Sequence, residues 1–355
     1  MKKSLDFLIK SMNGMAYGLF STLIIGTILG TISGFISDDT LVFYMLDSLA
    51  KLLKNLTGVG IGVGIAWSLK LDGLKLICAT VSGGITSYYS SIKFWDYFGV
   101  VDYNNVIDFS AKFQIGDPLS IYIVVICTIL LVNLVFKKKT PVDIIIIPLF
   151  SVIVAGLMAF FVCGPISYFT ALVGNFVNVA TELQPFLMGI IISVVMGMSL
   201  TAPISSAAIA VTIGLDGLAG GAAVVGCCVQ MLGFAVMSRK DNPIGMVISV
   251  GIGTSMLQFK NILKKPIVWL PTIIVSGILG PIATCLFKLK CNPTGAGMGT
   301  SGLVGYFGTI DAMGGLANSW WIILILLLVL PIILVFIFDL IFRKYNLIKE
   351  NDLTI

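Results

Sequence analysis

The sequence contains no histidine and very little charge. Of its 355 residues only 11% are charged, 57% are hydrophobic, and glutamate and arginine each occur twice. An ordinary soluble domain has about 25% charged residues, so this composition excludes a soluble protein. Without histidine the chain lacks the usual imidazole metal ligand, the proton shuttle that titrates near neutral pH, and any phosphohistidine carrier. Its chemistry must use carboxylates, amides, hydroxyls and backbone groups.

The cysteines and basic residues do not indicate a metal site or nucleic-acid binding. The seven cysteines lie mostly inside apolar runs, where cysteine usually behaves as a small buried hydrophobe. We therefore expect no disulfide, no metal cluster and no cofactor. The net charge of +5 comes mostly from lysines in short connecting segments. Nucleic-acid binding requires a clustered basic face, so we do not expect nucleic acid as a partner.

Apolar stretches recur along the chain at the length that crosses a bilayer, which is about 20 residues for about 30 Å of hydrocarbon. They predict an all-α polytopic membrane protein, embedded in the lipid bilayer as a single transporter-like domain over residues 1–355. The ten candidate transmembrane helices are 14–36, 42–70, 72–92, 118–136, 142–163, 183–200, 216–237, 243–258, 266–287 and 319–342.

The positive charges predict the orientation of these spans. Ten spans put both termini on one side, and the lysines near the N-terminus together with Arg343 and Lys344 place that side in the cytoplasm. The lysines at 260–265 also lie inside in this arrangement. Arg239 and Lys240 lie outside, against the positive-inside rule.

Two stretches, 200–215 and 291–315, are too polar or too rich in glycine for lipid-facing helices. Non-helical backbone is tolerated at membrane depth only where protein or a water-filled cavity satisfies its polar groups. We therefore predict two re-entrant hairpins that border a cavity. The most polar stretch, 93–114, is expected to form an exterior loop.

A short sequence recurs at an offset of 144 residues. The sequence LDGL occurs at 71–74 and again at 215–218, and further identities link 56–66 with 200–210. Internal repeats are common in transporters. We therefore predict duplicated halves over about 40–165 and 183–342, and the sequence leaves open whether they are inverted.

Two glycine clusters allow different interpretations. Alternate glycines at 58–64 give overlapping GxxxG spacings, which favour close helix packing. No strand precedes them, so a dinucleotide-binding loop is not supported. The second cluster, TGAGMGTSG at 294–302, lacks the lysine of a P-loop. Its hydroxyls and backbone N–H groups suit an anion or sugar hydroxyls at a broken helix end, and its glycines equally suit a gate or tight bend.

Polar side chains within apolar segments are candidate site groups because burying them in a membrane is costly. Glu182 and Asp311 are the candidate carboxylates, although Glu182 also suits the first turn of a helix. Asp72 and Asp216 precede glycine and are expected to cap helices. Gln230 lies in the middle of an apolar span, where an interhelical hydrogen bond is its simplest role.

The chain resembles a known permease family in four segments. These are NGMA at 13–16, the run LQPFLMGIIISVVMGMSLTAPISSAAIAVTIGLDGLAGG at 183–221, NILKKPIVWLP at 261–271 and NPTGAGMGTSGLVG at 292–305. They resemble the membrane-embedded IIC (EIIC) family of the bacterial phosphotransferase system, in its perfringolysin-regulator-type branch. The resemblance implies a ten-helix-type transporter with re-entrant hairpins, a homodimer in a bacterial plasma membrane, and sugar phosphorylation by separate IIA and IIB proteins. Relatives use a histidine and a glutamate to bind sugar, whereas this chain has only Glu182 in its membrane-embedded region.

We therefore expect a permease for a small polar solute, a sugar if the resemblance holds, that works by alternating access. No catalytic residue is expected on the chain. The alternative is a membrane sensor or regulator with a transporter-like fold that controls gene or toxin expression. The candidate substrate-binding residues are Asn178, Glu182, Gln184, Thr201, Ser205 and Ser206 in one half of the site and Thr294, Thr300, Ser301 and Asp311 in the other.

Overall fold

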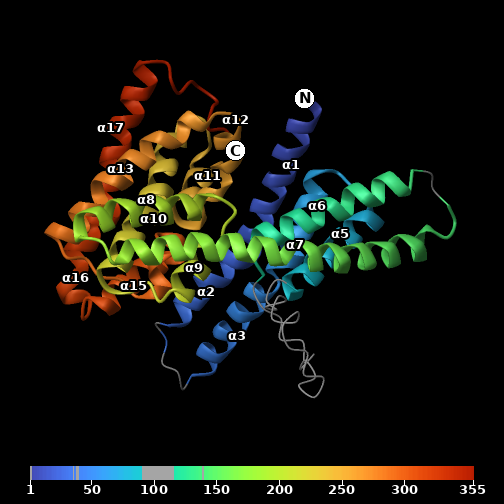
Figure 1. Cartoon of the computed structure of the whole chain (residues 1–355), viewed down its shortest axis with the longest axis horizontal. Coiled ribbons are helices and arrows are strands. Elements are labelled where there is room, and N and C mark those ends of the chain that lie inside the picture. The colour runs from blue at the N-terminus through green and yellow to red at the C-terminus, as the bar shows by residue number, and fades with distance from the viewer. Residues whose placement is uncertain (1, 35, 37–39, 90–115, 138–139) are drawn as a thin grey trace. The chain divides into compact units, whose positions relative to one another are not determined.

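The computed structural model describes residues 2–34, 36, 40–89, 116–137 and 140–355, and their regular structure is helical (Figure 1). The predicted all-α class is therefore confirmed. The exterior loop predicted at 93–114 lies outside the described residues. The chain divides into two compact units, Met1–Phe169 (unit 1) and Thr170–Ile355 (unit 2).

Unit 1 is built from seven helices in the described ranges, the last of which continues into unit 2. They are α1 (Lys2–Leu19), α2 (Ile25–Ser33), α3 (Leu41–Asn55), α4 (Thr57–Ser68), α5 (Gly73–Tyr89), α6 (Pro118–Val135) and α7 (Asp143–Thr181). A π-helical turn, Phe20–Ile24, joins α1 to α2 without a break.

Unit 2 contains longer helices interrupted by short ones. They are α8 (Pro185–Thr201), α9 (Ser206–Thr212), α10 (Gly217–Ser238), α11 (Ile244–Ile248), α12 (Phe259–Lys264), α13 (Leu270–Pro281), α14 (Pro293–Ala296), α15 (Val304–Ala312), α16 (Leu316–Ile322) and α17 (Leu330–Lys344). A π-helical turn, Ser249–Gly253, and a 3-10 turn, Ser255–Gln258, follow α11.

Six of the described helices are long and apolar enough to cross a membrane, or seven if α3 and α4, which meet at 54°, form one broken span. All of them fall on predicted spans, so a multi-pass membrane protein is confirmed. The predicted spans at 183–200 and 243–258 correspond to shorter apolar helices. The structure does not confirm the predicted number of ten, because 243–258 forms a hairpin rather than a span. The six are Asp6–Ser33, Pro118–Val135, Asp143–Thr181, Gly217–Ser238, Pro266–Leu286 and Ser319–Lys344.

Helix α7 continues well beyond the predicted span at 142–163. It has 39 residues and contains Pro148 and Pro165 within it. At about 1.5 Å per residue such a helix is longer than the hydrocarbon core is thick. Its last part is amphipathic, because Gly174, Val177 and Ala180 are buried while most residues between them are exposed. The predicted span at 142–163 is therefore only the first part of a longer helix.

Glycine brings α1, α4 and α5 into backbone contact in unit 1. A Cβ atom on Gly64 would overlap the carbonyl oxygen of Gly14, and one on Gly83 would overlap that of Gly58. Tyr17 and Trp67 flank the first contact with an edge-to-face ring pair. The helix-packing interpretation of the glycines at 58–64 is confirmed.

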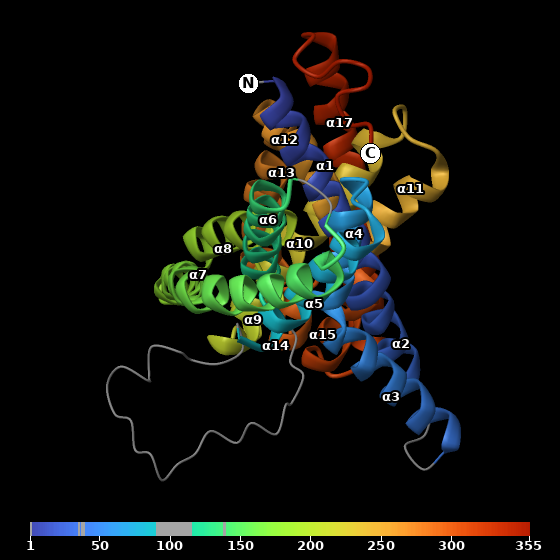
Figure 2. The ribbon, with the colours of Figure 1, turned by 90° about the vertical axis from the view of Figure 1, so that its right-hand side faces the viewer.

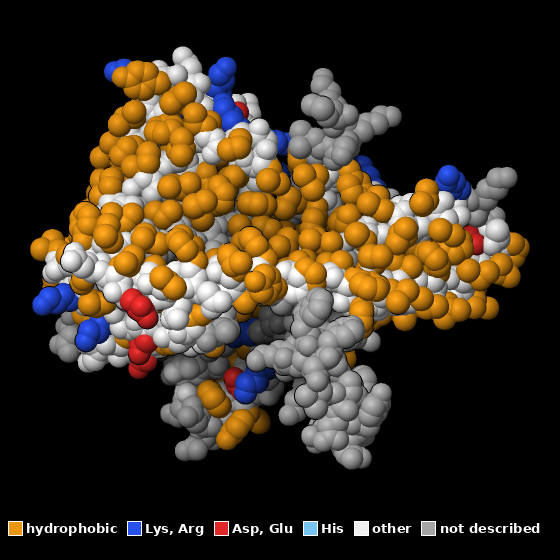
Figure 3. Space-filling view, in the orientation of Figure 1, with side chains coloured by type: hydrophobic (Ala, Val, Ile, Leu, Met, Phe, Trp, Pro, Cys, Tyr) orange, Lys and Arg blue, Asp and Glu red, His pale blue; other side chains and the backbone are white. Residues whose placement is uncertain are grey.

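Helix α10 is the buried centre of unit 2. In its most apolar 18-residue stretch, 89% of the helix is buried inside the protein. Helices α8, α13 and α17 pack around it (Figures 1 and 2). Gly226 permits the closest approach, since a Cβ atom there would overlap the backbone of Ser193 in α8. By contrast, the visible surface over α13 and α17 is mostly hydrophobic, with basic side chains at the upper end of α17 in Figure 3. This surface is suited to lipid.

Two polar hairpins enter unit 2 beside the Gly217 end of α10 and turn back. In the first, α8 runs to Thr201 and α9 returns toward Gly217. In the second, Cys291 donates its backbone N–H to Gly217 O (3.2 Å), the chain reaches Thr300 beside Met231, and Gly305 returns to Val224. Both correspond to predicted hairpins and end beside the same part of α10.

A third hairpin enters from the Ser238 end and replaces the predicted span at 243–258. The apolar helix there, Ile244–Gly253, is too short to cross about 30 Å of hydrocarbon. Residues on both sides of it bind the same terminal segment, because Asn242 donates to Leu353 O (2.7 Å) and Asn261 donates to Thr354 O (3.1 Å). The segment leaves and returns at one end of unit 2.

This hairpin corrects the predicted position of Arg239 and Lys240. They lie at the same end of unit 2 as the lysines at 260–265, not on the opposite side. Asp339, which is fully buried, accepts from Arg239 Nη1 (2.9 Å) and Arg343 Nε (2.8 Å) and joins α17 to the end of α10. Arg239 and Lys240 thus lie at the same end of unit 2 as its other basic residues, and their conflict with the positive-inside rule is removed.

The two LDGL sequences share the backbone turn that precedes them, although Gly217 has a left-handed φ of 59° and Gly73 does not. Leu71 donates its N–H to Ala66 O (3.1 Å), and Leu215 donates to Ala210 O (2.8 Å). The residue before each leucine, Lys70 or Gly214, has a left-handed φ of 53° or 62°. Each aspartate then accepts a backbone N–H of the following helix, as predicted for caps. These matches fit a duplication, which stays a prediction.

We predict that Gly64→Ala destabilises unit 1 by about 1–3 kcal/mol, because the added methyl group overlaps the backbone of α1. Thermal unfolding of the purified protein in detergent measures the change. Gly156→Ala in α7 is the control: its Cβ would meet no atom within 4 Å, so the higher helix propensity of alanine should leave stability equal or raised. Equal melting of Gly64→Ala and wild type would contradict the packing account.

We also predict that stability depends on the ionisation of Lys260, which is 7% exposed in α12. Burial lowers the pKa of this ammonium group to about 8. Between about pH 8 and 10.5 the unfolded chain holds this proton and the folded chain releases it, so stability rises with pH in that window. Lys260→Met lacks this dependence. Because Lys260→Met buries no charge, this variant should be more stable than wild type at pH 7, and the difference should shrink by pH 10. Thermal unfolding of both proteins at the two pH values measures it, and a difference independent of pH would contradict the assignment.

Candidate functional site

A glutamine in the middle of α10 is completely enclosed by protein. Gln230 is 0% exposed, and its Oε1 accepts three hydrogen bonds. The donors are Trp269 Nε1 at 3.0 Å, Thr272 Oγ1 at 3.0 Å and Thr201 Oγ1 at 3.3 Å. The interhelical hydrogen bonding predicted for Gln230 is confirmed.

One of the three donors fixes the orientation of the amide. An indole N–H donates and never accepts, so the group that faces Trp269 must be the carbonyl oxygen of Gln230. The amide nitrogen, Nε2, then points elsewhere and finds no hydrogen-bond partner among the described residues. A buried polar group in this state costs about 1–3 kcal/mol. A hydrogen-bond acceptor supplied by a ligand would remove that cost.

The polar centre extends from Gln230 to the third hairpin through Thr201. Thr201 Oγ1 lies 2.8 Å from Ser255 Oγ, which belongs to the 3-10 turn Ser255–Gln258. Thr201 and Ser255 are both fully buried. The tip of the first hairpin therefore meets the third hairpin beside Gln230. We call Thr201, Gln230, Ser255, Trp269 and Thr272 the polar centre.

The second hairpin reaches α10 at Met231, the residue next to Gln230. Thr300 donates to the carbonyl oxygen of Gly251 in the third hairpin and lies 3.3 Å from Met231 Sδ. The neighbouring Ser301 is 1% exposed, and its Oγ is without a partner in the described part of the chain. The left-handed φ of 55° at Gly299 lets this tip lie against Cys227, where a Cβ would be 2.8 Å from that residue's backbone.

The first two hairpins also contact each other. Ser206 Oγ donates to the carbonyl oxygen of Gly297 (2.7 Å), and Ser206 is 3% exposed. Ser205 instead caps α9, because its Oγ accepts the N–H of Ala208 (3.3 Å). Of the ten candidate residues, four are thus buried at the hairpin tips and contacts: Thr201, Ser206, Thr300 and Ser301.

The other candidates lie away from the polar centre. Asn178, Glu182 and Gln184 are exposed near the end of α7 and the start of α8. Thr294 is exposed in α14. Asp311 is exposed and accepts from Asn292 Nδ2 (2.9 Å), while Asn292 caps α14. In this conformation the carboxylates do not contribute to the polar centre, whose side chains are uncharged.

Sequence reasoning missed Ser255, Trp269 and Thr272. Ser255 and Thr272 are hydroxyls in apolar surroundings, where hydroxyls commonly bond the backbone of their own helix. Trp269 had a detectable signal, since an indole N–H in an apolar segment requires an acceptor. Gln230 was such an acceptor, but spans far apart in sequence give no indication of which one faces it.

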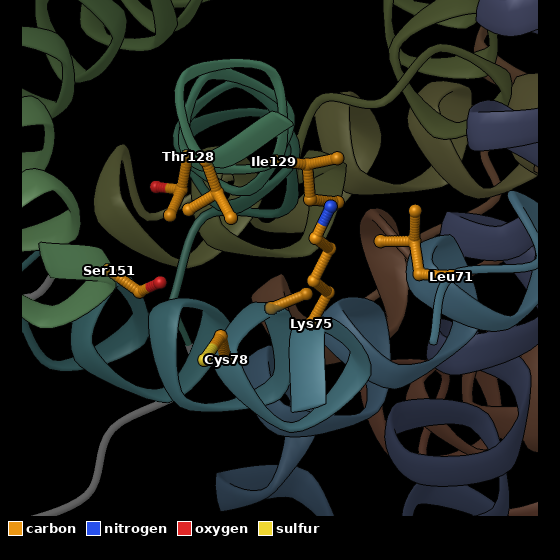
Figure 4. Close-up of a pocket in the computed structure, with 8 residues that line it drawn as sticks. Leu71, Lys75, Cys78, Thr128, Ile129 and Ser151 are labelled. Carbon is orange, nitrogen blue, oxygen red and sulfur yellow. The ribbon is translucent and has the colours of Figure 1, made fainter. Parts of the chain in front are cut away.

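Two cavities among the described residues of unit 1 share Lys75 of α5. The larger, about 420 Å³, is lined by both acids and bases, including Asp72, Lys137 and Asp143. The smaller, about 10 Å³, has room for about one water molecule and lies between Lys75, Cys78, Thr128 and Ser151 (Figure 4). Lys75 Nζ donates to Asn133 Oδ1 (2.6 Å). The ammonium group is therefore held by a neutral amide between α5 and α6.

We predict that Leu303→Gly stabilises the second hairpin. Leu303 has a left-handed φ of 62° and is 39% exposed, and a left-handed conformation costs a non-glycine residue about 1–2 kcal/mol. Glycine removes that strain but adds freedom to the unfolded chain, so we expect a net gain of about 0.5–1 kcal/mol. Leu286→Gly, also at an exposed leucine but within a helix, should lower the melting temperature. A destabilised Leu303→Gly would contradict the strain.

Comparison with known proteins matches nearly the whole chain to one family. The model of the family described as "Phosphotransferase system, EIIC" matches residues 9–355. A search among curated proteins finds no similar sequence. The matched region includes nearly all of unit 1, the whole of unit 2 and all residues of the polar centre.

Proposed function

The chain belongs to the phosphotransferase system EIIC family, and from that membership we propose that it carries a sugar across the membrane by alternating access, with the polar centre as the binding site. The family supports a permease component that works with IIA and IIB proteins. We also propose that the protein acts as a homodimer, as the sequence resemblance implies. The family match gives no support to the sensor alternative.

The single observation that carries the proposal is the unsatisfied amide of Gln230 at the point where hairpins from both ends of unit 2 meet. A buried amide with a free NH2 group in an apolar helix is costly. Transporter sites typically lie near the middle of the bilayer, between interrupted helices. Gln230 lies near the middle of α10 and beside the tip of an interrupted segment, which supports this assignment.

Two hydrogen bonds between opposed hairpins suggest how access alternates. Thr201 bonds Ser255, and Thr300 bonds Gly251. The first member of each pair belongs to a hairpin that enters from the Gly217 end, and the second belongs to the hairpin that enters from the Ser238 end. Withdrawal of either set of tips would open the polar centre toward one end while the other set stays closed.

The chemistry of the polar centre favours a neutral polyhydroxyl solute. Its side chains are an amide, hydroxyls and an indole, which donate and accept hydrogen bonds without charge. Gln230 Nε2 has no partner among the described residues and can donate to such a hydroxyl group, and so can Ser301 Oγ at the tip of the second hairpin. A charged solute would need a counter-charge at this depth, because an isolated ion is far more costly to bury.

Phosphorylation of the sugar requires a phosphate donor outside the described site, since the sequence has no histidine. We propose that the Ser238 end of unit 2 faces the cytoplasm and the IIB partner. Its basic residues support this orientation by the positive-inside rule. They are Arg239, Lys240, Lys260, Lys264, Lys265, Arg343 and Lys344.

The proposal predicts that Gln230→Leu lowers sugar uptake about tenfold or more, the effect of one lost hydrogen bond of about 1.4 kcal/mol. Proteoliposomes containing the protein are supplied with phosphorylated IIB and a panel of radiolabelled hexoses, hexitols and disaccharides. Gln184→Leu, the same substitution at an exposed glutamine, is the control and should keep wild-type uptake. Unchanged uptake by folded Gln230→Leu would reject the polar centre as the binding site, and no uptake of any sugar by wild type would reject the function.

A further inference from the structure

The last residues of the chain lie in a groove formed by two connections of unit 2. Leu353 is 0% exposed and Ile348 is 2% exposed, although both belong to a segment without a long helix. The groove is formed by the residues just after α10 and by those from Gln258 to Lys265. The segment is therefore docked.

Side-chain amides of the groove bind the backbone of this segment. Leu353 O accepts from Asn242 Nδ2 (2.7 Å) and from Gln258 Nε2 (2.9 Å). Asn242 Oδ1 accepts the N–H of Ile355 (2.8 Å), and Asp241 Oδ2 accepts the N–H of Leu353 (3.1 Å). The segment is therefore held through its backbone as well as its side chains, although residues 350–353 form a turn.

Two side chains of the segment fix its position in the groove. Leu353 provides a buried apolar anchor, and Asp352 forms an ion pair with Lys265 Nζ (2.5 Å). The bond and charge of Lys265 hold the pKa of Asp352 below its usual value, against the effect of burial. Asp352 also accepts the N–H of Lys349 (2.6 Å), which closes the segment into a turn.

The groove is connected to the polar centre through one short turn. Gln258, which binds Leu353 O, and Ser255, which binds Thr201, are the two ends of the same 3-10 turn. Asn261 Nδ2 also donates to Gln258 Oε1 (2.7 Å), so both ends of the Gln258 amide are bonded. The docked segment thereby fixes the turn that holds Ser255 against Thr201.

We propose that the segment Lys349–Ile355 is a latch that holds the third hairpin closed over the polar centre, and that Asp241, Asn242, Gln258 and Asn261 form its docking groove. That this closure regulates transport rests on the proposed function. The closure itself does not, because it concerns only contacts within unit 2. When the segment leaves the groove, Gln258 loses a partner and the hairpin is free to withdraw Ser255 and Gly251 from the opposing tips.

The latch is tested by hydrogen–deuterium exchange of the full-length protein in nanodiscs. Leu353→Asp places a charge in the buried anchor site, and Lys265→Asp removes the ion pair with Asp352. Both variants should exchange amides in 249–258 about tenfold faster than wild type, as expected for local opening. Amides of α13, which packs against α8 and α10, should be unchanged, and this shows that each variant is folded.

Two further variants separate docking from a general effect of charge. Lys264→Asp makes the same charge change at the neighbouring lysine, which is exposed, and should exchange like wild type. The double variant Lys265→Asp/Asp352→Lys restores the ion pair with reversed polarity. Its amides in 249–258 should exchange more slowly than those of Lys265→Asp, at a rate closer to wild type. Wild-type exchange in both Leu353→Asp and Lys265→Asp would overturn the latch, as would equal acceleration by Lys264→Asp.

Uptake measured on the same variants distinguishes the latch from the proposed function. Faster exchange at 249–258 with uptake changed at least twofold supports both. Faster exchange while wild type carries no sugar in the panel retains the latch and rejects the function. Sugar uptake by wild type, with exchange and uptake unaltered in both Leu353→Asp and Lys265→Asp, retains the function and overturns the latch.

Discussion

Unit 2 depends on one constraint: a helix enclosed by other helices, within a protein whose outer surface is apolar, can satisfy a polar side chain only with other protein groups or a ligand. Helix α10 is such a helix, and Gln230 is its polar side chain. The three donors to its carbonyl oxygen come from α8 and from the region around the start of α13. The hydrogen bonds of Gln230 therefore join α10 to the tip of the first hairpin and to the start of α13.

Much of the fold could be predicted from the sequence, because hydropathy depends on composition over about 20 residues. The described long helices all begin or end close to predicted spans, and the glycines at 58–64 pack as expected. The exceptions share a cause. The predicted span 142–163 continues to Thr181 in α7, and the apolar helix within 243–258 is too short to cross. A hydropathy window of about 20 residues detects apolar stretches but does not show where the helix within them ends.

The site was less predictable, because it is formed by contacts between segments distant in sequence. Polarity at membrane depth identified Thr201, Ser206, Thr300 and Ser301, which the structure buries near hairpin tips. The same criterion selected exposed residues such as Glu182, which lies in the turn between α7 and α8, since a sequence does not show how deep a residue lies. Recognition of Trp269 required its acceptor in another helix. The family match, over residues 9–355, adds the general activity but not the solute.

The carboxylate of Asp339 limits which parts of unit 2 are able to move. It is fully buried and shared by guanidinium groups from the end of α10 and from α17. Separating a buried charge from its partners costs about 3–5 kcal/mol, which is much more than a single neutral hydrogen bond between hairpin tips. Helices α10 and α17 therefore behave as one rigid frame, and the energetically cheaper rearrangement is for the short interrupted segments to slide along it.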